Sequence, residues 1–101
     1  ILAECRYRLR SGSETEFREL SSETLWPSLR ANDARMVIYG KDLLATADEV
    51  VELTAYRSIS AWHQLLTPTG DTEKVAAKRQ SLIADMQTRL LMVQTDFGER
   101  V

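Results

Sequence analysis

Residues 49–66, EVVELTAYRSISAWHQLL, decide the fold that this sequence predicts. The first half of the stretch alternates as an extended strand does, which predicts a strand over residues 49–56. A short helix follows, because Ser58 is a good helix cap and Pro68 with Gly70 ends helical structure. The strand has two faces, with Val51, Leu53 and Ala55 on one and Glu52, Thr54 and Tyr56 on the other.

Three further strands flank this stretch. Residues 1–9 alternate, residues 34–40 contain an unbroken apolar run typical of a strand buried on both faces, and residues 88–95 form the last strand. The first strand presents on one face Ala3, Cys5, Tyr7 and Leu9.

Two longer helices complete the pattern. The first covers residues 14–31, where Ser13 and Glu16 have the spacing of a capping box and Pro27 bends the helix. The second covers residues 71–86, and residues 96–101 form a tail. The inner stripe of the second helix consists of Val75, Ala76, Leu82, Ile83 and Met86.

The order strand, helix, strand, strand, helix pair, strand predicts an α+β fold of the ferredoxin-like split βαβ type. Its four-stranded antiparallel sheet carries helices on one face. A length of 101 residues with 44% hydrophobic residues predicts a single domain over residues 1–101.

A sheet with helices on one face leaves the other face bare, and an uncovered apolar face favours a partner. The candidates for such a face include Val50, Tyr56, Leu90 and Met92. A second copy of the same sheet covers it best. We therefore predict a homodimer whose two sheets close into a dimeric α+β barrel.

Composition argues against several other classes of function. A net charge of −2 lacks the basic footprint of a nucleic-acid-binding protein, and the apolar runs are too short to cross a membrane. Cys5 is the single cysteine, which favours a reducing cytoplasmic location. One histidine, one cysteine and four scattered glycines predict neither a metal centre nor a phosphate-binding loop, so no cofactor is predicted.

His63 is the candidate catalytic residue. On a helix that begins after Ser58 it shares a stripe with Ile59, Trp62 and Leu66, which directs the imidazole inward. An inward histidine acts as an acid or base near neutral pH, or binds a ligand oxygen. The alternative is a core histidine with a backbone or tyrosine hydrogen-bond partner.

The candidate ligand-binding residues are mostly aromatic. Trp26 lies off the main stripe of its helix beside Pro27, which favours either a place at a pocket mouth or a packed ring at the helix edge. Arg6 either holds a ligand carboxylate or belongs, with Arg8, Glu4 and Glu52, to a set of oppositely charged pairs on one sheet face. The remaining candidates are Tyr7, Tyr56 and Trp62.

The opening ECRYRLRSGS, residues 4–13, resembles the start of NIPSNAP-family domains, in which a strand of this pattern leads into a glycine turn and a helix. Residues 49–56, followed by a serine-rich helix start, extend the resemblance. It implies a dimeric α+β barrel of the group that also holds antibiotic-biosynthesis monooxygenases, EthD-like proteins and muconolactone-isomerase-like enzymes. Residues 56–66 are similar to the helix entry of the monooxygenases, where a histidine recurs.

The resemblance leaves more than one function open. The first is a NIPSNAP-like homodimer that binds a small molecule in a pocket between the sheet and the helices. The second is a cofactor-free monooxygenase or isomerase for a small aromatic or polyketide-like substrate, with His63, Trp26 and Tyr7 at its site. The third, implied by fold relatives alone, is heme handling with His63 as axial ligand.

Overall fold

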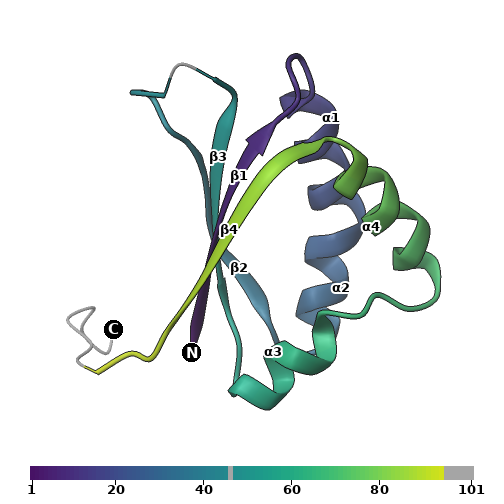
Figure 1. Ribbon diagram of the computed structural model, residues 1–101. Coiled ribbons are helices and arrows are strands. Elements are labelled where there is room, and N and C mark those ends of the chain that lie inside the picture. The colour runs from purple at the N-terminus through teal and green to yellow at the C-terminus, as the bar shows by residue number, and fades with distance from the viewer. Residues whose placement is uncertain (46, 95–101) are drawn as a thin grey trace.

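The computed structural model describes residues 1–45 and 47–94. Its centre is one antiparallel sheet with the strand order β2-β3-β1-β4 (Figure 1). The two central strands, β3 and β1, run antiparallel to each other. The strands are β1 (Leu2–Leu9), β2 (Arg35–Lys41), β3 (Glu49–Ala55) and β4 (Ile83–Leu91).

The helices α1, α2 and α4 lie on one side of the sheet, and α3 lies at one end of it (Figure 1). The chain between β1 and β2 forms α1 (Glu14–Leu20), the π-helical turn η1 (Ser21–Leu25) and α2 (Trp26–Ala31). The chain between β3 and β4 forms α3 (Ile59–Leu65) and α4 (Asp71–Ser81). This order and sheet topology confirm the predicted ferredoxin-like α+β fold.

Strand register decides which side chains meet the helices. Cys5 lies opposite Glu52 on β3 and opposite Thr88 on β4, and Tyr7 lies opposite Val50 and Met86. Because alternate residues share a face, the helix-covered face of β1 carries the four residues predicted for one face of that strand. Val50, Glu52 and Thr54 on β3 are buried on the same side.

The main core lies where α1 and the end of α4 meet the sheet. Phe17 and Val50 are fully buried there, and the Phe17 ring packs between Tyr7 and Tyr39, with ring centroids 5.2 and 6.5 Å away. Leu9, Leu82 and Ile83 complete this cluster. Burial of these aromatic and aliphatic side chains stabilises the contact between helices and sheet.

The sequence predicts one bent helix over residues 14–31, and the structure refines this. The chain widens into η1 directly before Pro27, where the N–H of Trp26 reaches the carbonyl of Ser21. A π-helical turn accommodates a proline that has no N–H to donate. The predicted capping box is wrong, because the Ser13 side chain makes no capping hydrogen bond.

The boundary between α4 and β4 also differs from the prediction. The helix ends at Ser81, before the predicted residue 86, and the strand begins at Ile83, five positions before the predicted residue 88. The apolar residues between the observed and the predicted boundary fit the periodicity of a helix and that of a strand. Pairing with β1 favours the strand, because Arg10 N–H donates to the carbonyl of Leu82 at 2.8 Å. The end of the predicted strand and the tail lie outside the described residues.

The strand β3 and the capped helix after it match the prediction. Ser58 Oγ accepts a hydrogen bond from the Ala61 N–H at 3.1 Å, and α3 begins at the next residue. The expectation that β2 is buried on both faces is wrong. It is an edge strand, and Val37 and Ile38 remain 46% and 54% exposed.

The sheet face away from the helices has a different composition from the one predicted. Val50 is buried beneath the helices, Leu90 is opposite Ala3 on the helix side, and Met92 follows the end of β4. By register the outer face combines charged residues with an apolar group, which we call the outer apolar group. Its members are Leu2, Ile38, Val51, Leu53, Ala55 and Leu91.

The charged part of the outer face pairs internally. Glu4 Oε1 accepts a hydrogen bond from Arg89 Nη2 at 3.1 Å and lies 3.5 Å from Arg6 Nε.

Among the described residues, no helix has the length and apolar character needed to cross a bilayer.

Replacement of Phe17 by Ala is expected to lower the free energy of unfolding by about 3–5 kcal/mol, because the lost ring leaves a cavity between Tyr7 and Tyr39. Urea unfolding followed by circular dichroism measures the change. The matched control is Leu44→Ala, at a side chain that is 95% exposed, and it is expected to change stability by less than about 0.5 kcal/mol. Similar losses for both variants would contradict this account of the core.

Candidate functional site

A cavity of about 740 Å³ lies between the sheet and the helices. Its floor comes from β1, β3 and β4, its roof from α2 and α4, and one end from α3 and the loop that follows. Exposed residues such as Leu66 and Thr69 belong to its lining, so the cavity is open to solvent there. A concave site with apolar walls and a few polar groups is the usual form of a small-molecule site.

Four of the five predicted ligand-binding residues line this cavity. Tyr7 comes from β1, Trp26 from the start of α2, Tyr56 from the residue directly after β3 and Trp62 from α3. They come from four separate segments, and the topology brings them together. The structure brings these four aromatic side chains to one cavity, and their binding of a ligand stays a prediction.

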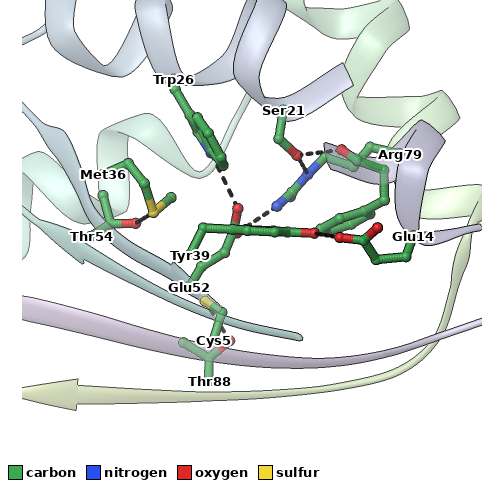
Figure 2. Close-up of polar contacts among 11 residues, drawn as sticks. Cys5, Glu14, Ser21, Trp26, Met36, Tyr39, Glu52, Thr54, Arg79 and Thr88 are labelled. Carbon is green, nitrogen blue, oxygen red and sulfur yellow. Dashed lines mark hydrogen bonds and ion pairs between the residues drawn. The ribbon is translucent and has the colours of Figure 1, made fainter. Parts of the chain in front are cut away.

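A buried ion pair forms the polar centre of the cavity. Glu52 is 4% exposed, and its Oε1 accepts a hydrogen bond from Arg79 Nη2 at 2.5 Å (Figure 2). Its Oε2 accepts a hydrogen bond from Trp26 Nε1 at 3.2 Å. Both carboxylate oxygens therefore have a partner, which a buried carboxylate requires.

Aromatic rings and a buried hydroxyl hold the guanidinium of Arg79. Its Cζ lies 4.2 Å from the centroid of the Phe17 ring and 5.0 Å from that of Tyr7, in a cation–π arrangement. Its Nε donates to Ser21 Oγ at 2.8 Å, and that hydroxyl donates to the Phe17 carbonyl at 2.7 Å. Arg79 is thus fixed from α1, η1 and β1 at once.

The π-helical turn places two of these groups. Ser21 begins η1 and is fully buried, and Trp26 begins α2 directly after it. The wider turn rotates the residues that follow it relative to a regular helix, which turns the off-stripe Trp26 toward Glu52 (Figure 2). The Trp26 ring also packs at a tilt against Tyr39, with centroids 5.4 Å apart.

The electrostatics of the cavity keep its phenols protonated and its arginine charged. Burial raises the pKa of Tyr56 to about 12, and burial together with the Glu52 carboxylate raises the pKa of Tyr7 well above its ordinary value. Burial by itself lowers the pKa of Arg79, but the Glu52 charge outweighs it and the pKa is raised. Burial and Glu14 raise the pKa of Tyr39, whose hydroxyl donates to Glu14 at 3.1 Å.

Solved structures with the same fold include a NIPSNAP family protein from Agrobacterium tumefaciens, at 20% identity and a TM-score of 0.75, with 95% of this chain and 93% of that chain covered. An uncharacterized NIPSNAP domain protein from Burkholderia xenovorans follows at 18% identity and a TM-score of 0.73, with 93% and 96% covered. This chain has the NIPSNAP fold.

The same fold extends to an enzyme. SnoaB, a cofactor-independent oxygenase from Streptomyces nogalater, matches at 14% identity and a TM-score of 0.68, with 97% of this chain and 96% of that chain covered. No family model and no curated protein matches the sequence. The resemblance to NIPSNAP-family domains is confirmed at the level of the fold, and identities this low carry no activity over to this chain.

The structure does not place His63 as the sequence predicts. The imidazole is exposed on α3, and the cavity takes its neighbours Trp62 and Gln64 instead. The inward direction is wrong because α3 covers only the end of the sheet, so its outer residues meet solvent. A catalytic role for His63 stays a prediction, and it loses the inward geometry on which it was based.

Arg6 lies on the outer face of the sheet, away from the cavity. Strand alternation separates it from Tyr7, and its neighbour is Glu4. The expected pairing of Glu4 with a strand arginine is found, while the expected pairing of Glu52 with Arg6 is wrong. Glu52 is opposite Cys5, on the helix side, and its partner is Arg79.

Arg79 is the site residue that the sequence analysis missed, although a signal for it was present. It falls four residues after Val75 and three before Leu82, on the predicted inner stripe of the second helix. A charged residue on an apolar stripe points to a buried partner. Ser21 carried no such signal, because its burial depends on the π-helical turn.

Cys5 is a minor component of the cavity. Its Sγ lies 3.6 Å from Thr88 Oγ1 across the β1–β4 pair.

Among the described residues, no group of three or more His, Cys, Asp or Glu side chains lies close enough together to hold a metal ion.

Arg79→Met is expected to lower the free energy of unfolding by about 3–5 kcal/mol, because it leaves the Glu52 carboxylate buried without a countercharge. The double variant with Glu52→Gln and Arg79→Met is expected to recover most of this loss, since the amide is neutral and still accepts from Trp26. Urea denaturation of both variants measures the difference.

The control is Arg57→Met, at an exposed pair with Asp33 for which the expected loss is at most about 1 kcal/mol. A double variant as unstable as the single one would show that the charge pair is not what stabilises this site.

Proposed function

We propose that this chain is a NIPSNAP-like domain that binds a small molecule in the cavity between its sheet and helices and that works as a homodimer. The observation that supports binding most directly is the cavity lining. Two indoles and two phenols surround a polar centre whose charges already neutralise each other. Walls of this kind offer large apolar contact area together with a few directed hydrogen bonds.

The outer face of the sheet supports the homodimer. The outer apolar group lies on central and edge strands without a covering helix, and Ile38 is 54% exposed. Beside it, Glu4, Arg6 and Arg89 form a charged cluster of both signs, which a second copy meets with the same residues in a two-fold arrangement. A second sheet removes the apolar residues from water. The lone Cys5 favours a cytoplasmic location.

The alternative function is a cofactor-free monooxygenase or isomerase, which the likeness to SnoaB favours. Such chemistry needs an acid or base inside the cavity. Glu52 is committed to Arg79 and Trp26, and the other carboxylate of the lining, Glu73, is exposed to water. His63 is exposed and lies outside the lining. Binding is therefore the better-supported function.

Titration with 1-naphthol tests the binding function. We expect saturable binding by calorimetry, and Ala76→Trp, which puts a ring into the cavity from α4, is expected to weaken it at least tenfold. The matched control Ala31→Trp lies on an exposed position of α2 outside the lining and is expected to bind as the parent does.

If Ala76→Trp and Ala31→Trp had the same effect on the affinity for 1-naphthol, the ligand would not be bound in the cavity. Oxygen consumption with a panel of quinols tests the alternative function, and turnover that disappears in Ala76→Trp would favour the enzyme.

Light scattering on a gel-filtration column tests the assembly. At micromolar concentration we expect the mass of two chains for the parent and of one chain for Ile38→Glu, because the new carboxylate enters the outer apolar group. The matched control Leu44→Glu, on an exposed loop residue, is expected to remain dimeric. A parent protein that elutes as a single chain would rule out the homodimer.

A further inference from the structure

Among residues 1–45 and 47–94, three charged residues belong to the lining of the cavity: Glu52, Glu73 and Arg79. Glu52 and Arg79 form the buried pair at the centre, and Glu73 is exposed on α4 near the solvent side. The pair has no net charge, and Glu73 adds a negative one. Over the residues that the structure describes, the lining therefore carries a formal charge of −1, with no positive charge that is free of a partner.

From this arrangement we infer that the cavity selects uncharged ligands that carry an oxygen and rejects carboxylates, an inference that rests on the proposed binding function. In a typical anion site an arginine binds the carboxylate of the ligand. Arg79 does not do so, because the Glu52 carboxylate already occupies the place that a ligand carboxylate would take. Because Glu52 neutralises its charge, Arg79 offers a ligand directed N–H donors but no net positive charge that would attract an anion.

The cost of an anionic ligand follows from the geometry. A ligand carboxylate beside Arg79 lies within a few ångströms of Glu52 in a place largely shielded from water, where repulsion between like charges is strong. To take the place of Glu52 it would have to leave that carboxylate buried without a partner.

A cationic ligand meets the opposite obstacle. Arg79 repels it at the centre of the cavity, and both oxygens of Glu52 already accept hydrogen bonds. Near the solvent side, Glu73 attracts it, but water screens that interaction.

An uncharged oxygen finds donors in the same place. A guanidinium has five N–H donors, and Arg79 directs one to Ser21 and one to Glu52, while the residue as a whole lines the cavity. The phenols of Tyr7 and Tyr56 stay protonated at neutral pH and are further donors. Around them, apolar surface comes from Leu29, Met36, Trp62 and Met86. A ligand with a ring system and a carbonyl or hydroxyl oxygen matches this lining.

The test uses three probes that share one ring: 1-naphthol, 1-naphthoate and 1-naphthylmethylammonium. Their affinities for the full chain are measured at neutral pH by calorimetry. In parallel, the NMR resonance of the Trp26 indole N–H reports binding beside Glu52. A Trp62→Phe variant assigns the two tryptophan signals. We expect 1-naphthol to bind at least about tenfold more tightly than either charged probe.

Two matched substitutions locate the cause. Glu52→Gln leaves the charge of Arg79 without its partner and is expected to strengthen naphthoate binding on the order of tenfold or more, with a smaller change for naphthol. Glu73→Gln makes the same chemical change at an exposed position and is expected to change naphthoate binding less than about twofold. Should Glu52→Gln fail to fold, the comparison of probes on the parent chain still decides.

The outcomes separate this inference from the function on which it rests. Binding of naphthoate as tight as that of naphthol would overturn the selection for uncharged ligands while leaving the cavity as a binding site. Failure of all three probes to bind, with the Trp26 signal unmoved, would overturn the binding function and this inference with it.

Discussion

The ion pair between Glu52 and Arg79 is the constraint on which the rest of this structure depends. A carboxylate on the central strand β3 faces the helices rather than water, so a cation must come from the helix layer. That cation is on α4, and its position fixes how α4 crosses the sheet. Phe17, Tyr7 and Ser21 hold the guanidinium, so α1 and η1 are tied to the same point.

The pair also divides the space between helices and sheet into two parts with different properties. On one side lies the filled core around Phe17 and Val50, which supplies stability by burial. On the other side lies the cavity, whose aromatic walls meet water at the solvent side. Trp26 belongs to both the pair and the wall, so a ligand in the cavity contacts the group that orients Glu52. Stability and proposed binding are thus linked through a few side chains.

Strand alternation gives the two faces of the sheet different charged residues. Alternation along β1 directs Tyr7 to the cavity and Arg6 to the outer face, where Glu4 and Arg89 surround it as a charged cluster. The helix-covered face holds the charge pair that needs shielding from water. The outer face holds charges that tolerate water beside apolar residues that do not, which is the composition on which the proposed homodimer is based.

The sequence by itself determined the order of strands and helices, because alternation, Ser58 and Pro68 are local signals. It also predicted Tyr7, Trp26, Tyr56 and Trp62 as candidate pocket residues. Trp26 lies off the stripe of its helix, Trp62 lies on the inward stripe of its own, and the tyrosines carry hydroxyls that can reach a ligand. Only the tertiary structure decided that His63 faces solvent and that Arg79 completes the site. The first depends on where α3 lies at the end of the sheet. The second depends on contacts between residues more than twenty positions apart, which local periodicity does not contain.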